Sequence, residues 1–173
     1  MLSDLQKRKM IARFNFHDVD NSGTRTESDF KTVINNLVNL LDVAGSERES
    51  QIAAAIMAEW DVLKTTADLD DDGAVSKEEF LAHCDRMISD QAVFDTVSAA
   101  ASKTLFDILD ADGDDYVSVD EMILYYKANE QPEDLARRCF AKVSNGSEKL
   151  SRERTYEALN EFCLLYTSDA ADE

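Results

Sequence analysis

Residues 68–79 place oxygen-bearing side chains at a spacing that suits a divalent cation. Aspartates stand at positions 1, 3 and 5 of this stretch, glycine at position 6 and glutamate at position 12. Ca²⁺ takes about six to eight oxygen ligands, and a short segment supplies them only when acids recur at every second residue before a sharp turn. Gly73 permits that turn, because a residue without a Cβ atom adopts positive φ without steric penalty. We expect Ser76 at position 9 to act through water. The predicted ligands are the side chains of Asp68, Asp70, Asp72 and Glu79 and the carbonyl of Ala74.

Residues 18–29 repeat this pattern with two departures. Arg25 replaces an apolar residue at position 8, and Asp29 replaces glutamate at position 12. The shorter carboxylate should reach an ion less easily and with one oxygen. We therefore expect weaker Ca²⁺ binding here and better tolerance of Mg²⁺, which prefers six-coordination. The alternative is a vestigial segment that no longer binds an ion. The predicted ligands are the side chains of Asp18, Asp20, Ser22 and Asp29 and the carbonyl of Thr24.

Residues 110–121 carry the pattern a third time, with aspartate instead of glycine at position 6. Aspartate tolerates the left-handed conformation better than most residues, so Asp115 should still allow the turn, with some affinity lost to strain. Below, residues 18–29, 68–79 and 110–121 are called loops one, two and three. The predicted ligands of loop three are the side chains of Asp110, Asp112, Asp114 and Glu121 and the carbonyl of Tyr116.

Residues 143–155, called loop four, break the pattern, because they have no acid at the start and no glutamate at the end. We predict that this loop binds no ion and keeps a structural role. Loops of this kind pair through a small backbone bridge at position 8. Leu150 should therefore lie opposite Val117, as Val75 should lie opposite Arg25.

Stretches with helical periodicity flank each loop and must position its ligands. Gly45 should end the second helix, and Ser46 with Glu49 should form the capping box that starts the third. Trp60, the single tryptophan, should be a core residue of that third helix. Apolar residues of the second helix recur on one face at Phe30, Val33, Ile34, Leu37, Val38 and Leu41.

These elements predict an all-α fold of four helix–loop–helix units arranged as two pairs. The N-terminal pair should span residues 1–89 and the C-terminal pair, with its degenerate loop four, residues 90–162. The join at Ser89 and Asp90 is short and lacks glycine and proline. The two pairs should therefore pack together as one compact unit rather than hang on a flexible link.

The chain has 173 residues with 36 acidic and 18 basic side chains, which gives a net charge of −18. This charge opposes binding to nucleic acid and to anionic membranes, and it favours cations or basic peptides. Three cysteines without a regular framework fit a reducing compartment. The N-terminal segment lacks the apolar core of a signal peptide, and no stretch approaches the roughly 20 apolar residues of a membrane span. We expect a monomeric cytoplasmic protein.

Nothing in the sequence indicates catalysis. The chain shows no nucleophile paired with a base, no zinc-type cluster of cysteine and histidine, and no glycine-rich phosphate loop. We therefore expect no enzyme.

Residues 163–173 resemble the translated read-through of a transposase-type sequencing adapter. The alternative is an acidic tail that frays. The resemblance implies that the native C-terminus after Phe162 is missing, so this tail is excluded from functional interpretation.

Loop two carries the full EF-hand calcium-loop pattern. Three such loops followed by a degenerate fourth resemble the sarcoplasmic calcium-binding proteins, a branch of the EF-hand superfamily related to calexcitin and the coelenterazine-binding photoproteins. Residues 5–9 ahead of Phe14, and residues 60–63 ahead of Ala67, are also similar to that branch. The resemblance covers Ser3 to Phe162. It implies two EF-hand pairs, with Ca²⁺ in loops one to three and none in loop four.

Three functions remain open. The first is an intracellular Ca²⁺ buffer with Mg²⁺ competition at loop one, in which ion binding relieves carboxylate repulsion and stabilises the fold. The second is a Ca²⁺ sensor that exposes a groove to a partner helix, although the internal methionines are dispersed rather than gathered on one surface. The third is a Ca²⁺-triggered small-ligand carrier or photoprotein, which would need a large cavity near Trp60.

Overall fold

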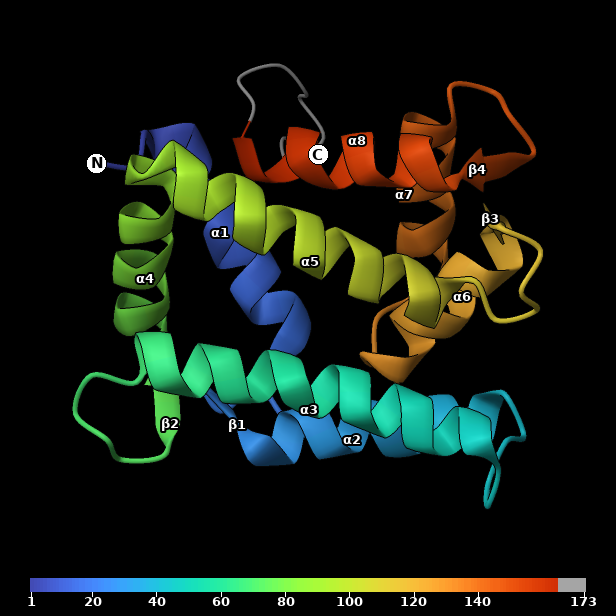
Figure 1. Ribbon diagram of the computed structural model, residues 1–173, viewed down its shortest axis with the longest axis horizontal. Helices are drawn as coiled ribbons and strands as arrows, with labels where there is room; N and C mark the ends of the chain where they lie inside the picture. The colour runs from blue at the N-terminus through green and yellow to red at the C-terminus, as the bar shows by residue number, and fades with distance from the viewer. Residues whose placement is uncertain (165–173) are drawn as a thin grey trace.

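The computed structural model describes residues 1–164, without the side chains of residues 91, 93, 95, 96 and 159–164. Within this part of the chain, eight helices and four short strands form the all-α architecture that the sequence predicts (Figure 1). The helices are α1 (Asp4–His17), α2 (Glu27–Leu40), α3 (Glu47–Ala67), α4 (Lys77–Ser89), α5 (Gln91–Leu109), α6 (Val119–Ala128), α7 (Glu133–Ser144) and α8 (Arg152–Leu164). The strands are β1 (Thr24–Thr26), β2 (Ala74–Ser76), β3 (Tyr116–Ser118) and β4 (Lys149–Ser151).

Helix starts follow the capping residues in the sequence. Ser3 and Gln6 form the capping box of α1. The predicted box at Ser46 and Glu49 is only half formed. Ser46 Oγ accepts from the Glu49 amide at 3.3 Å, but the Glu49 carboxylate accepts from the amide of Gly45 instead of Ser46.

The strands pair the loops as predicted. β1 lies antiparallel to β2 with Arg25 opposite Val75, and β3 lies antiparallel to β4 with Val117 opposite Leu150. The two sheets lie at opposite ends of the view in Figure 1. Loop four therefore has the structural role that its sequence predicts, because its strand completes the sheet of loop three.

The two halves of the chain share a hydrophobic core. The larger cluster of buried residues extends from α1–α4 to Ile108 of α5 and Ala128 of α6. Helix α2 contacts α6, α3 contacts α5, and α1 contacts α8. Trp60 is 4% exposed, and its ring centroid lies 5.2 Å from that of Phe30, which confirms its place in the core. The halves pack together as expected, while the residue at which the chain divides into two units stays a prediction.

Polar contacts also join the halves. Asn36 of α2 donates to the carbonyl of Ala128 at 2.9 Å. His17 Nδ1 lies 3.2 Å from the side-chain oxygen of Asn129, which is fully buried after α6. Because buried polar groups are costly without partners, these contacts favour one relative placement of the halves.

Helix α8 is described as far as Leu164. The rest of the tail that resembles an adapter lies outside the described residues, so its origin stays a prediction. Among the described helices, none is long and apolar enough to cross a membrane.

Leu150→Ala tests the structural role of loop four. Leu150 is 2% exposed, so its truncation should lower the free energy of unfolding by about 2–5 kcal/mol through lost burial and a residual cavity. Urea unfolding at saturating Ca²⁺ measures the change. Val62→Ala, at a position 54% exposed in α3, is the matched control and should change stability by at most about 0.5 kcal/mol. Equal effects of the two substitutions would contradict the role assigned to Leu150.

Candidate metal centres

The carboxylate at position 1 is held the same way in loops one to three. In loop one, Asp18 accepts from the amides of Ser22 and Gly23, both at 3.0 Å. Asp68 and Asp110 accept from the corresponding two amides of their own loops at 3.0–3.2 Å. Hydrogen bonds from amides to a carboxylate are charge-assisted. They fold each loop around its first acid.

The carboxylate at position 12 bonds to both ends of its loop. Glu121 accepts from the amide of Ala111 at 2.9 Å and from the amide and hydroxyl of Ser118, both at 2.8 Å. Glu79 makes the same bonds with Leu69 and Ser76. These hydrogen bonds, first from the Ser76 amide and then from the Leu69 amide, lower the pKa of the Glu79 carboxyl below its usual value.

Asp29 makes the equivalent contacts despite its shorter side chain. It accepts from the Val19 amide at 3.0 Å through one oxygen and from the Thr26 amide at 2.8 Å through the other. It is 3% exposed. The loss of one methylene is thus accommodated by the loop, and both oxygens remain directed toward it. How many of them an ion would engage stays a prediction.

Three groups of carboxylates have the compactness that an ion requires. Within each group, one ligand atom per residue lies within 4.8 Å of those of the others. Oxygens on opposite sides of Ca²⁺ are separated by about 5 Å, twice the usual Ca–O distance, so each group fits such an ion. The groups are Asp18, Asp20 and Asp29 in loop one, Asp68, Asp70 and Asp72 in loop two, and Asp110, Asp112 and Glu121 in loop three.

Two of the predicted acidic ligands lie outside these groups. Glu79 is oriented toward its loop by the bonds described above but is not among the three acids grouped in loop two. Asp114 is also outside the group in loop three. The remaining predicted ligands are carbonyls of the strand residues Thr24, Ala74 and Tyr116, and the hydroxyl of Ser22, which donates to the Thr24 carbonyl at 3.0 Å.

Each metal loop turns through two left-handed residues. At position 6, Asp115 has φ +64°, which confirms that it adopts the conformation of the glycine it replaces. The second such residue, at position 4, was missed by the sequence analysis. It is Asn21 in loop one, Asp71 in loop two and Gly113 in loop three. The signal was available, because asparagine, aspartate and glycine are the residues that tolerate positive φ.

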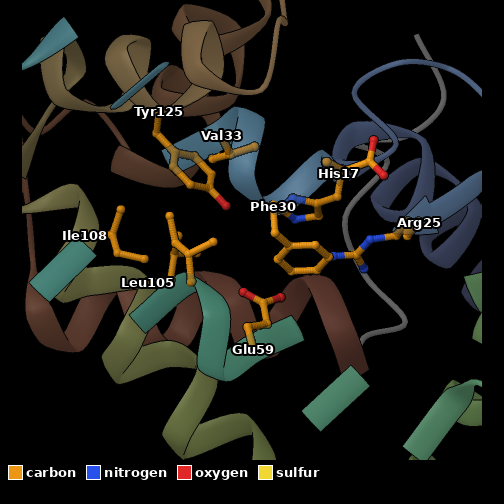
Figure 2. A pocket seen from close by; sticks show the side chains of 10 residues that line it. His17, Arg25, Phe30, Val33, Glu59, Leu105, Ile108 and Tyr125 are labelled. Carbon is orange, nitrogen blue, oxygen red and sulfur yellow. The ribbon is translucent and has the colours of Figure 1, made fainter. Parts of the chain in front are cut away.

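Arg25, at position 8 of loop one, is a buried residue, although the sequence marked it only as a departure, and Figure 2 shows its guanidinium beside the ring of Phe30. It is 2% exposed, and its guanidinium carbon lies 4.9 Å from the ring centroid of Phe30 and 5.6 Å from that of Phe80. Its Nε and Nη2 have no hydrogen-bond partner among the described residues. Desolvation lowers the pKa of Arg25 to about 10, and the negative charge of Glu59 acts in the opposite direction. The side chain therefore remains cationic at neutral pH.

A small cavity adjoins this guanidinium. Its volume is about 30 Å³, room for about one or two water molecules. Figure 2 shows the imidazole of His17, the hydroxyl of Tyr125 and the carboxylate of Glu59 directed toward it. Burial, with the charges of Arg25 and Arg13, holds the pKa of His17 well below its ordinary value. The cavity beneath loop one is thus narrow, and it combines these polar groups with apolar walls formed by residues such as Val33, Leu105 and Ile108.

Arg48 links the N-terminal half to loop three. From the first turn of α3, its Nη2 donates to the carbonyl of Asp107 at 2.8 Å and to that of Asp110 at 3.3 Å. Asp110 is position 1 of loop three. A groove of about 390 Å³ lies alongside, between α3 and the end of α5. No local pattern in the sequence indicated this contact.

Gly113→Ala tests the turn at position 4. Its φ is +75° and no atom lies within 4 Å of an added Cβ, so the cost is conformational, about 1–2 kcal/mol. Calorimetric titration should show Ca²⁺ binding weakened by about tenfold at one site. Gly113→Asn should keep the affinity, since Asn21 occupies this conformation in loop one. Gly45→Ala, at φ +77° outside the loops, should cost stability without changing affinity. Equal affinities for the alanine and asparagine variants would contradict the prediction.

Comparisons with known proteins agree with this geometry. Residues 66–84 match a family model described as EF hand. Sarcoplasmic calcium-binding proteins II, V, VI and VII of Branchiostoma lanceolatum are 30% identical over 132 residues, 73% of this chain and 71% of the relative. A Streptomyces coelicolor calcium-binding protein, described as acting in calcium-mediated regulation, is 27% identical, with a TM-score of 0.76 over 94% of this chain and 99% of its own. The coelenterazine-binding protein of Renilla muelleri, 20% identical, shares the fold, with a TM-score of 0.77 over 98% of this chain and 96% of its own. These matches confirm the resemblance, and the chain belongs to the sarcoplasmic calcium-binding protein family of EF-hand proteins.

Proposed function

We propose that this protein is a monomeric cytoplasmic Ca²⁺ buffer that takes up one ion in each of loops one to three. The observation that carries this proposal is the set of three carboxylate groups, each compact enough for Ca²⁺. The ligands are the fifteen residues named above from their positions in the three loops. Without an ion, the clustered carboxylates repel one another, so ion binding stabilises the fold by mass action.

The packing of the helices favours a buffer over a sensor. A sensor separates helices to expose an apolar groove when the ion binds. Here α2 packs on both α3 and α6, and the larger core extends across both halves. Opening one pair would therefore disrupt the contact between the halves. The Streptomyces coelicolor relative, described as acting in calcium-mediated regulation, keeps the sensor as the second candidate.

The interior disfavours a carrier of an organic ligand. Pockets for small molecules have volumes of about 300–1,000 Å³. The groove of about 390 Å³ beside Arg48 falls in this range, but it is lined by the charged side chains of Asp107 and Asp110 as well as Arg48, not by the mainly apolar walls of such pockets. The cavity beneath loop one has about 30 Å³. It is too small for an aromatic chromophore, and we expect neither ligand carriage nor enzymatic activity.

A Ca²⁺ titration of the full chain in millimolar Mg²⁺ tests the buffer. The melting temperature should rise with Ca²⁺, because each site at 100 times its dissociation constant adds about 2.7 kcal/mol of stability. A dye that fluoresces on exposed apolar surface should show a flat or falling signal. A sharp rise of the dye signal with Ca²⁺ would establish the sensor instead, and a melting temperature unchanged by chelator would contradict Ca²⁺ binding itself.

Exchanging the residues at position 12 tests Mg²⁺ competition at loop one. Asp29→Glu should favour Ca²⁺ over Mg²⁺ there by about tenfold, or about 1.4 kcal/mol, because the longer carboxylate engages Ca²⁺ with both oxygens. Glu79→Asp in loop two is the reciprocal variant and should shift selectivity toward Mg²⁺. Competition calorimetry with and without Mg²⁺ measures both. Identical selectivity in the two variants and the wild-type chain would contradict the role of side-chain length.

A further inference from the structure

Two cations of loop four contact acids of loop three. Lys149, in β4, forms an ion pair with Asp114. Arg152, the first residue of α8, donates to Asp115 at 2.7 Å and to Asp107 at 3.0 Å. The pairing of β3 with β4 places Lys149 opposite Ser118 and so beside the metal loop.

The ion pair involves the predicted ligand at position 5. Asp114 is the acid that stands outside the compact group of loop three, whereas its counterpart Asp72 belongs to the group of loop two. A predicted Ca²⁺ ligand, Asp114, is thus already paired with a positive charge of the protein, the ammonium of Lys149.

Loops one and two differ in this respect. In the described part of the chain, no ion pair reaches their predicted acidic ligands. The residue equivalent to Lys149 is Thr24, which β1 places opposite Ser76 of loop two. A neutral side chain therefore stands beside loop two where an ammonium stands beside loop three.

We infer that Lys149 is an internal counter-cation that competes with Ca²⁺ for Asp114 and so lowers the affinity of loop three below that of loop two. This inference rests on the proposed role of loop three as a metal site. The ammonium repels an incoming divalent ion and withholds one carboxylate from it. It also reduces carboxylate repulsion when Ca²⁺ is scarce, so it stabilises the sheet of β3 and β4 under those conditions. Two unequal sites widen the range of Ca²⁺ concentrations over which the protein buffers.

Calorimetric titration of the full chain with Ca²⁺ tests the inference. Lys149→Thr, which copies the residue of loop one, should tighten one site by about three- to tenfold, a size expected for one partly exposed charge near the ion. Lys149→Arg should bind as the wild-type chain does. Lys142→Gln removes a charge from the exposed face of α7 and should change affinity by less than about twofold because of screening.

A second readout does not depend on affinity. In chelator, Lys149→Thr should melt at a lower temperature than the wild-type chain, because the carboxylates of loop three lose their counter-cation. At saturating Ca²⁺ its melting temperature should equal or exceed the wild-type value. Lys149→Gln serves as a second neutral variant if threonine perturbs the strand. Unchanged or weaker binding in the neutral variants, or an equal gain in Lys142→Gln, would overturn the inference.

Glu121→Gln separates this inference from the assignment of loop three. If loop three is a metal site, this substitution removes one ion from the stoichiometry. Adding Lys149→Thr to it then changes neither the stoichiometry nor the affinities of the two remaining sites. If the stoichiometry stays the same, the assignment of loop three is wrong and the inference fails with it. If one ion is lost but Lys149→Thr alone leaves affinity unchanged, the assignment stands and the counter-cation role is wrong.

Discussion

The carboxylate at position 12 belongs at once to a metal loop and to the start of a helix, and the rest of each loop depends on this double attachment. Asp29, Glu79 and Glu121 are each the third residue of an exit helix and complete its capping box. Their other oxygen accepts from an amide near the beginning of the same loop. The carboxylate thus makes charge-assisted hydrogen bonds with amides near the start of the loop and at the start of the exit helix, and these bonds hold the loop closed. Ion binding and helix initiation therefore cannot vary independently in this protein.

Loop pairing then makes neighbours of sites with different chemistry. The sheet of β1 and β2 joins two acidic loops, and the buried Arg25 lies beneath one of them. The sheet of β3 and β4 joins an acidic loop to one that supplies Lys149 and Arg152. Each pair of loops thus contains positive charge. In the N-terminal pair it is the buried Arg25, and in the C-terminal pair it is Lys149 and Arg152 at the loop surface. The same architecture provides two ways to moderate a net charge of −18.

Features that rest on local spacing could be predicted from the sequence. The three acidic loops, the capping box of α1 and the positive φ of Asp115 follow from residue types a few positions apart. The sheet register also followed, because equivalent positions pair in related units. The burial of Arg25, the bonds of Arg48 to the carbonyls around loop three and the contact of Lys149 did not follow. Each depends on a partner from a distant element, which a local pattern does not place.

The hydrophobic cluster that extends from the first four helices to Ile108 and Ala128 restricts how such a chain can change by recombination. If one half were replaced by the corresponding half of a distant homologue, its apolar face would not fit the apolar face of the remaining half. The contact between His17 and the buried Asn129 would also be lost. A loop ligand such as Glu79 accepts hydrogen bonds from its own loop, whereas the surface between the halves must change on both sides together. A substitution at this surface in one half therefore needs a compensating substitution in the other half, far away in the sequence.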